Sequence, residues 1–127
     1  MGLIVHIAEK KNWEKAKKQG IYAVESLKSD GFIHCSTIGQ VMDTANLFFP
    51  GRQDLILLCI DESKTSSQVK YEPPTGEVPN NPSVEAMFPH LYGPLNLDAV
   101  VNVFDFPPDP DGTFQLPGEV AKIEAGL

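Results

Sequence analysis

Short apolar runs, separated by turn signals, recur along the first hundred residues and predict a domain that mixes strands and helices. The longest uninterrupted run is Leu-Ile-Leu-Leu-Cys-Ile, which stands between Asp54 and Asp61. A strand that is apolar on both faces belongs in the middle of a sheet, so this one is predicted to be central. The predicted strands lie at 3–7, 21–24, 31–35, 54–61, 68–72 and 99–106.

Two amphipathic helices are predicted between these strands. Asn12 is a suitable N-cap for the first helix, and Gly20 is a suitable residue to end it. Thr37 and Gln40 have the spacing of a capping box at the start of the second helix, which a Pro-Gly pair stops. The predicted helices span 11–19 and about 37–49.

A chain of 127 residues is long enough to bury its own core, so we expect a single α+β domain over residues 1–127. Its compact part should span about 3–106. Residues 73–82 contain four prolines and predict a long loop, a kind of segment that is often functional. Residues 107–127 are rich in Pro, Asp and Gly, which predicts a loosely held C-terminal tail.

The net charge of the chain limits the kinds of partner that it is expected to bind. Ten basic residues against 17 acidic ones give a net charge of −7, which repels nucleic acid, so no nucleic-acid partner is expected. The sequence has no apolar run of membrane-spanning length and no signal pattern, which favours a cytoplasmic protein away from membranes. A monomer is expected. The one basic cluster, at residues 10–18, is typical of the solvated face of a helix.

All three histidines, His6, His34 and His90, lie in short apolar segments that are predicted as strands or as turns beside strands. Histidine changes charge near neutral pH and offers two distinct nitrogens, so this placement favours one polar pocket lined by the sheet. The alternative is that each is a core histidine whose hydrogen bonds are satisfied inside the protein.

The two cysteines, Cys35 and Cys59, also lie in apolar strand-like runs, and no C-x-x-C motif is present. We expect buried, reduced thiols that pack as small apolar groups. The histidines could converge with Glu72 on a zinc ion, but the close ligand spacing that is frequent in metal sites is lacking, so no metal is expected.

The segment from Gly31 to Ser36 carries the first candidate site. Alternation along a strand places Phe32, His34 and Ser36 on one face, with Ile33 and Cys35 facing the core. Ser36 also precedes the second helix, where unpaired N–H groups attract a phosphate or a carboxylate. Alternatively, Ser36 only caps the helix and His34 is a satisfied core histidine.

The second candidate site is the motif Phe-Pro-His-Leu-Tyr-Gly-Pro-Leu at residues 88–95. Its prolines restrict the backbone, so His90 and Tyr92 are held rigidly enough to stack on a ring or direct a hydrogen bond. Glu72 ends a predicted strand and could pair with an imidazolium or act as a base. Alternatively, residues 88–95 form only a structural turn, and Glu72 is only an exposed carboxylate at the end of a strand.

These motifs resemble the DUF952 family of proteins of unknown function. The likeness rests on residues 31–37, on residues 88–95 and on the Tyr71-Glu72 pair, and it spans roughly residues 3–104. The family's fold is similar to that of ADP-ribosyltransferases, in which a split sheet surrounds a cleft for NAD. The resemblance therefore implies a small α+β domain with a split sheet, two helices and a cleft that can hold NAD, while the sequence itself leaves the cofactor unknown.

The same resemblance implies roles for individual residues. A histidine on the first strand of ADP-ribosyltransferases often contacts the NAD ribose, and His6 fits that position. A late Gln-x-Glu or Glu-x-Glu pattern is absent from this chain, so any catalytic carboxylate must come from elsewhere. The implied catalytic groups are Glu72 and His34, and the implied ligand contacts are His6, Tyr22, Ser36, His90 and Tyr92.

Three functions remain open at this point. The chain could be an enzyme of the ADP-ribosyltransferase type that binds NAD or a related nucleotide. It could be a binding module for a small molecule that kept the cleft without the chemistry. It could also be a structural or interaction protein whose histidines only stabilise the core.

Overall fold

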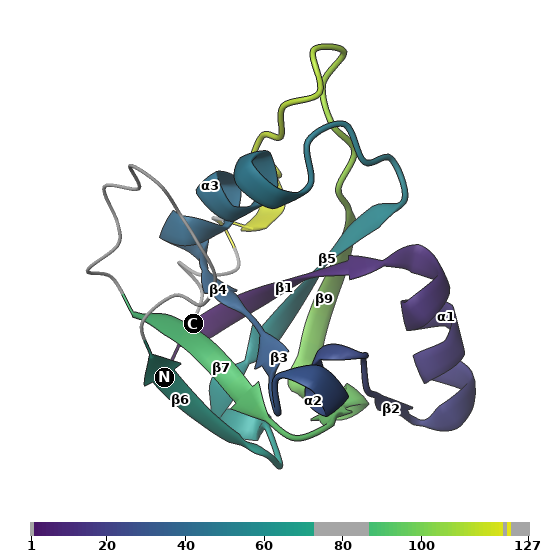
Figure 1. Ribbon diagram of the computed structural model, residues 1–127, viewed down its shortest axis with the longest axis vertical. Helices are drawn as coiled ribbons and strands as arrows, with labels where there is room; N and C mark the ends of the chain where they lie inside the picture. The colour runs from purple at the N-terminus through teal and green to yellow at the C-terminus, as the bar shows by residue number, and fades with distance from the viewer. Residues whose placement is uncertain (1, 73–86, 121, 123–127) are drawn as a thin grey trace.

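The computed structural model describes residues 2–72, 87–120 and 122 (Figure 1). The predicted loop at 73–82 lies outside the described residues. The helices are α1 (Lys10–Gln19), α2 (Ser26–Ser29) and α3 (Ile38–Phe48), with single 3-10 turns at Glu62–Lys64 and Leu97–Ala99. The strands are β1 (Leu3–Glu9), β2 (Ile21–Tyr22), β3 (Ile33–His34), β4 (Ser36–Thr37), β5 (Leu55–Asp61), β6 (Gln68–Glu72), β7 (Phe88–Tyr92), β8 (Leu95–Asn96) and β9 (Val100–Asp105).

These strands form antiparallel sheets, which confirms a mixed α+β fold. One sheet has the order β4-β1-β5-β9, a second has the order β3-β7-β6, and β2 pairs with β8. Strands β3 and β4 belong to different sheets and are separated only by Cys35, whose N–H donates to the carbonyl of Pro89 at 3.1 Å. This short crossing holds the two larger sheets side by side.

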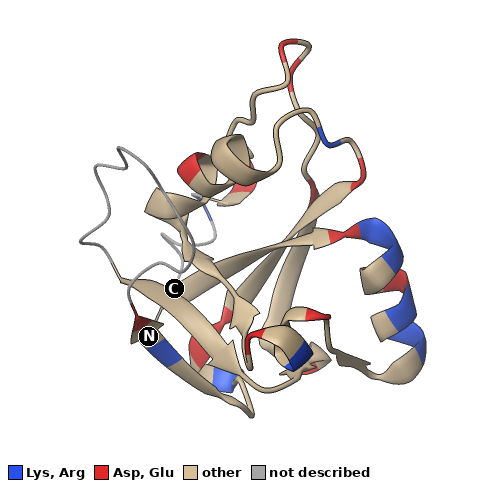
Figure 2. Cartoon of the chain, in the orientation of Figure 1, with Lys and Arg blue, Asp and Glu red and all other residues tan. Residues whose placement is uncertain are grey.

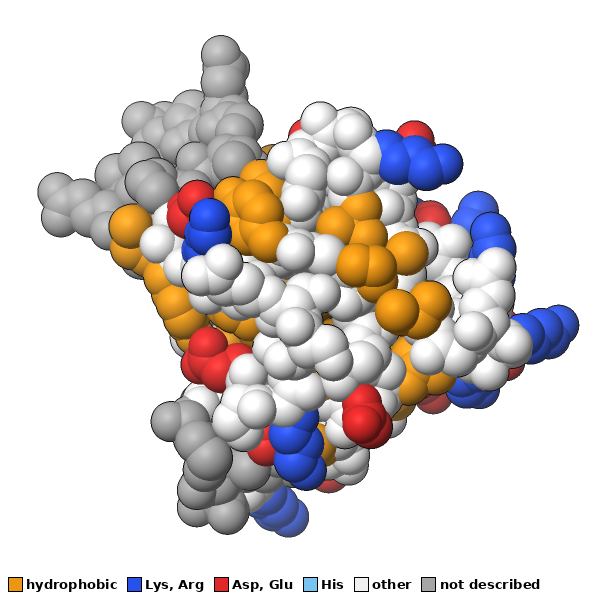
Figure 3. Space-filling view, turned by 90° about the horizontal axis from the view of Figure 1, so that it is seen from below, with side chains coloured by type: hydrophobic (Ala, Val, Ile, Leu, Met, Phe, Trp, Pro, Cys, Tyr) orange, Lys and Arg blue, Asp and Glu red, His pale blue; other side chains and the backbone are white. Residues whose placement is uncertain are grey.

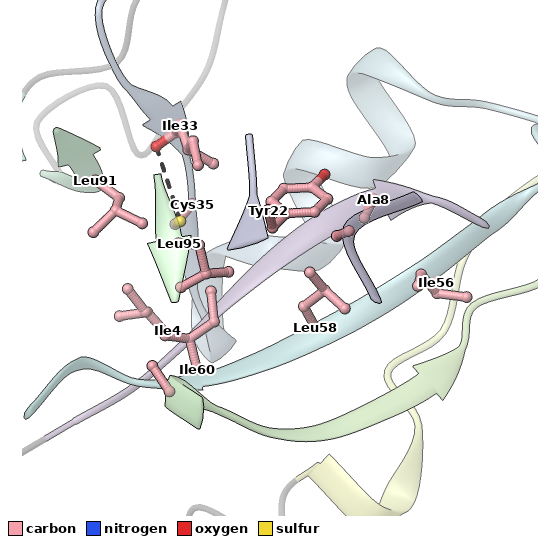
Figure 4. Close-up of a cluster of buried hydrophobic side chains, with 12 residues drawn as sticks. Ile4, Ala8, Tyr22, Ile33, Cys35, Ile56, Leu58, Ile60, Leu91 and Leu95 are labelled. Atoms are coloured by element: carbon pink, nitrogen blue, oxygen red, sulfur yellow. Dashed lines mark hydrogen bonds between the residues drawn. The ribbon is translucent and has the colours of Figure 1, made fainter. Parts of the chain in front are cut away.

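Buried side chains form a cluster on each face of the four-stranded sheet. Strand β5 is buried along its whole length and lies between β1 and β9, so the predicted central strand is confirmed. Successive side chains of β5 point to opposite faces and join different clusters. The cluster in Figure 4, which lies toward the other two sheets, includes Ile4, Ala8, Ile56, Leu58, Ile60, Ile33 and Leu91. The other cluster includes Leu3, Val5, Val41, Ala45, Leu55, Leu57 and Cys59.

Both predicted long helices are present, with one correction at a cap. Helix α1 ends at Gly20, whose φ of 83° is the left-handed conformation that glycine adopts without a steric cost. The predicted N-cap, Asn12, is wrong because the helix begins two residues earlier and Glu9 stands at the cap. Asn12 instead donates from Nδ2 to the Glu9 carboxylate at 3.0 Å. The predicted capping box at Thr37 and Gln40 is confirmed.

Two predicted strands are shorter in the structure. The strand expected at 21–24 ends at Tyr22, and helix α2 follows within a few residues. A helix of four residues is too short to produce a periodic pattern, so the sequence did not predict it. The strand expected at 31–35 is reduced to Ile33–His34 because the chain crosses to the other sheet at Cys35.

From the end of β9 to Val120 the chain packs against the rest of the domain, which corrects the prediction of a loosely held tail. Phe106, Phe114 and Val120 are buried in the same cluster as Val5 and Leu57. The rings of Phe106 and Phe114 stack with centroids 4.8 Å apart. The apolar residues of this segment complete the cover that α3 provides on that face of the sheet, and this outweighs its high content of Pro and Gly.

Both thiols are buried and free, as predicted. Burial raises the pKa of Cys35 to about 12 and that of Cys59 to about 11, so both remain protonated and unreactive near neutral pH. Within the described part of the chain, no helix is long and apolar enough to cross a membrane.

Candidate functional site

Polar and aromatic side chains gather on one face of the three-stranded sheet. His34 of β3 is directly opposite His90 of β7, and His90 is directly opposite Lys70 of β6. Directly paired residues of adjacent strands point to the same face, so these three residues form a row across the sheet. We call the group around this row the β7 face: Phe32, His34, Lys70, Glu72, His90 and Tyr92.

Phe32 packs the centre of the β7 face. Its ring stacks on the His90 imidazole, with centroids 4.1 Å apart and planes at 16°. The rings of His34 and Tyr92 lie 4.8 Å and 5.1 Å from that of Phe32. His90 is almost fully buried by these contacts, whereas His34 is exposed. The aromatic packing therefore fixes the plane of one imidazole and leaves the other accessible.

Glu72 holds two members of the β7 face through one oxygen. Its Oε1 accepts from His90 Nδ1 at 2.9 Å and from the Tyr92 hydroxyl at 2.5 Å. Hydrogen bonds from Tyr92 and His90 lower the pKa of the Glu72 carboxyl, and the bond to Glu72 raises the pKa of Tyr92. The Glu72 side chain remains 35% exposed, so an ionised and rigidly oriented carboxylate faces outward.

A cation borders this carboxylate, and an exposed histidine–aspartate pair lies across the row. Lys70 Nζ lies 4.7 Å from the centroid of the Tyr92 ring, a cation–π contact beside Glu72. On the other side of the row, His34 Nε2 lies 2.8 Å from Asp30 Oδ2, with both side chains nearly half exposed. The β7 face thus presents a lysine beside the Glu72 carboxylate and an exposed imidazole beside Asp30.

His6 and Tyr22 are not part of the β7 face. His6 Nδ1 lies 2.6 Å from the carbonyl oxygen of His34, so it donates there, and Nε2 then accepts from the Tyr22 hydroxyl at 2.9 Å. Burial lowers the pKa of His6 to about 4 and raises that of Tyr22, so both are neutral at pH 7. Tyr22 packs with Ile33 and Leu91, which alternate with the residues of the β7 face and point to its opposite side.

Ser36 is also separate from the β7 face. It is buried in β4, opposite Val5 of the four-stranded sheet. Within the described residues, no hydrogen bond joins it to His34 or His90. The expected face of Phe32, His34 and Ser36 therefore holds for the first two residues only, because the chain changes sheet at Cys35.

The sequence-based reasoning missed Lys70 and Asp30 as members of the site. Lys70 precedes Glu72 by two residues on a predicted strand, and that spacing places both on one face. Asp30 precedes His34 by four residues, within a Ser-Asp-Gly segment that is typical of a turn. In residues 2–72 and 87–120, no group of three or more His, Cys, Asp or Glu side chains is arranged to hold a metal ion.

This fold and this cluster define a small α+β protein with a histidine–carboxylate site on a three-stranded antiparallel sheet. Residues 7–103 match the family model described as a protein of unknown function, DUF952, so the chain belongs to the DUF952 family. No curated protein matches the chain.

Protein CC0527 from Caulobacter crescentus, a structural genomics target, is similar over nearly its whole length. Its crystal structure is 34% identical, with a TM-score of 0.79 over 94% of this chain and 98% of CC0527. Its solution NMR structure gives a TM-score of 0.76 over 96% of this chain and 99% of CC0527. At this identity the architecture of the sheets is shared.

Proposed function

We propose that this protein binds NAD or a related nucleotide on the β7 face. One observation carries the proposal: Glu72 fixes His90 and Tyr92 through a single oxygen while keeping its carboxylate partly exposed. Sites that hold a ligand or a transition state depend on this kind of rigid placement. The resemblance to the ADP-ribosyltransferase fold supplies NAD as the ligand class.

The accessible members of the β7 face, two of them exposed and Tyr92 partly buried, suit the parts of a nucleotide. Tyr92 offers an aromatic surface for a base or a nicotinamide ring, Lys70 offers a cationic contact for a phosphate group, and His34 offers an exposed ring nitrogen for a hydrogen bond. Two antiparallel sheets that meet at Cys35 are consistent with a split-sheet fold of the ADP-ribosyltransferase type. His6 and Tyr22 are assigned a structural role instead of ribose contact, because each uses its polar atoms on the other or on the backbone.

If the protein is an enzyme, Glu72 is its catalytic carboxylate. Its lowered pKa keeps it ionised at neutral pH, which favours stabilising positive charge at a reacting ribose over donating a proton. His34 is the accessible imidazole, and it can exchange a proton with the group that receives the transferred ribose. His90 is buried and acts by holding Glu72 in position.

The test is a two-dimensional amide NMR titration of the labelled protein with NAD, ADP-ribose and AMP. We expect saturable shifts at Lys70, Glu72 and Tyr92, and weaker binding in Lys70→Ala than in Lys28→Ala, a matched variant on the exposed surface of α2. No shifts at millimolar concentrations of all three ligands would remove the nucleotide proposal.

A second candidate is a binding module without catalysis. It is favoured by the engagement of Glu72 Oε1 with two internal donors and by the absence of a Gln-x-Glu or Glu-x-Glu pattern. Release of nicotinamide from NAD, lost in Glu72→Gln, would identify the enzyme. Saturable binding with no nicotinamide released by the unsubstituted protein would identify the module.

A further inference from the structure

The β7 face, together with Asp30 beside it, carries more negative than positive charge. Two carboxylates, those of Glu72 and Asp30, stand against one ammonium group, that of Lys70. The side chains of Glu72 and Asp30 are 35% and 45% exposed, so both carboxylates are open to a ligand bound on this face. A proton on His34, which is hydrogen-bonded to Asp30, would only balance the two signs. These charges do not favour a ligand that carries several negative charges.

Most of the positive charge of the chain lies away from the β7 face. Of the ten Lys and Arg residues, five lie on α1, whereas the chain as a whole carries a net charge of −7. These lysines are the blue stretch along α1 in Figure 2, and lysines gather along the same side of the molecule in Figure 3. Strands β6 and β7 lie on the other side of the molecule from α1 (Figure 1). Residues 73–86, which follow β6 in the sequence, contain two glutamates and no Lys or Arg. A ligand on the β7 face therefore meets the negative field of an acidic protein.

The helix N-terminus that the sequence suggested as a phosphate site is already capped. Thr37 and Gln40 form a capping box at the start of α3, and Gln40 Oε1 accepts from the Thr37 N–H at 3.0 Å. Ser36, which precedes this helix, is buried in β4. The capping box uses N–H groups that a phosphate would need, so Lys70 is left as the phosphate contact of the proposed site.

We propose that the β7 face selects nucleotides of low negative charge, holding one phosphate group at Lys70 and discriminating against a polyphosphate chain. This inference rests on the proposed function and adds to it the class of nucleotide. Lys70 is exposed and carries one compact charge, so it compensates a single phosphate contact. Each further phosphate lies near Glu72 and Asp30 without a cation of its own. NAD belongs to the favoured class, because the positive charge of its nicotinamide ring offsets part of its phosphate charge.

The test compares adenosine, AMP, ADP and ATP in amide NMR titrations at low ionic strength, with no added divalent cation. We expect the Kd to rise about threefold with each phosphate added to AMP, which is the effect of one more charge at about 7 Å in water. Raising the salt from about 0.01 M to about 0.15 M shortens the Debye length from about 30 Å to about 8 Å, so it should narrow these differences. A site built for polyphosphates gives the opposite result, an affinity that rises with the number of phosphates and falls with salt.

Asp30→Asn tests the local charge, because the asparagine oxygen can still accept from His34 Nε2. This variant should reduce the ratio of the Kd of ATP to that of AMP about threefold. Asp109→Asn is the matched control, since it removes the same charge from an exposed site. Asp109 belongs to the segment after β9, which lies at the top of Figure 1 and away from β3 and β7, so the control should leave the ratio within about 1.5-fold.

The outcomes separate this inference from the proposed function. If ATP binds as tightly as AMP or more tightly, or if both variants change the ratio equally, the selection by charge is overturned and nucleotide binding itself stands. If neither NAD nor any of the four adenosine ligands shifts the amides of the β7 face, both are overturned.

Discussion

At the residue scale, one oxygen of Glu72 organises the β7 face. The sequence placed Glu72 at the end of a strand near the histidines, and the structure gives it His90 as a partner. The bond from Tyr92 could not be predicted, because it depends on the register in which β6 pairs with β7. That register is a tertiary property, and a shift of one residue would move Glu72 to the opposite face of the sheet.

Tyr92→Phe should raise the pKa of Glu72 toward its ordinary value. Two hydrogen bonds lower this pKa, and the one from the Tyr92 hydroxyl, at 2.5 Å, has the larger effect. Carbon-13 NMR of the glutamate carboxyls across an acid titration measures the change. Tyr71→Phe is the matched control, because the Tyr71 hydroxyl donates to Glu62 instead. Equal effects of both variants, or no effect of Tyr92→Phe, would show that this hydrogen bond does not control Glu72.

At the scale of elements, the segment after β9 behaves as part of the core. Phe114 is buried against Phe106, and its backbone N–H donates to Asn46 Oδ1 of α3 at 2.7 Å. Phe114→Ala should therefore lower the free energy of unfolding by about 3 kcal/mol, the cost of removing a buried aromatic ring. Urea unfolding measures it. Phe48→Ala, at a site 53% exposed, is the control and should cost less than about 1 kcal/mol.

Two glycines near helix ends give a second prediction at this scale. Replacing them by alanine should change the free energy of unfolding in opposite directions. Gly20 ends α1 with a φ of 83°, so Gly20→Ala should lower the free energy of unfolding by about 1 kcal/mol. Gly39 lies inside α3, and a Cβ there would meet nothing closer than Thr37 Oγ1 at 4.0 Å. Gly39→Ala should raise stability by about 0.5 kcal/mol because alanine favours the helix. Thermal unfolding of both variants checks the pair, and effects of the same sign would contradict it.

At the scale of the whole molecule, elements with a long periodic pattern were predicted well and contacts between sheets were not. Strand β5 and helices α1 and α3 follow from local spacing, because each buries a face or a run that is visible in the sequence. The crossing at Cys35, where β3 ends and β4 begins, leaves no local pattern. That crossing places His34 and Ser36 in different sheets, so a segment that was expected to form one site is divided.

His6 lies where all three sheets meet. It belongs to β1 of the four-stranded sheet, its Nε2 accepts from Tyr22 of β2, and its Nδ1 donates to the carbonyl of His34 in β3. A proton added to His6 would remove the acceptor that Tyr22 uses and place a charge in a buried site. Folding of the three sheets around His6 therefore requires its neutral form.

The free energy of unfolding should fall as the pH is lowered from about 6.5 to about 4. Burial lowers the pKa of His6 from 6.5 to about 4, so between these values the unfolded chain binds a proton that the folded chain does not. This contribution is complete above pH 6.5 and amounts to about 3 kcal/mol over the interval. Urea unfolding at a series of pH values measures it.

His6→Gln removes the titrating group, so this variant should be less stable at pH 7 and should lose most of the slope between pH 6.5 and 5. That narrower window lies above the ordinary range of the carboxyl groups, whose lowered pKa values act at more acid pH. His34→Gln is the matched control, because it removes an exposed histidine and leaves the bonds of His6 in place. A slope that survives His6→Gln but disappears in His34→Gln would assign the pH dependence to the β7 face, and the junction of the sheets would then not depend on the neutral form of His6.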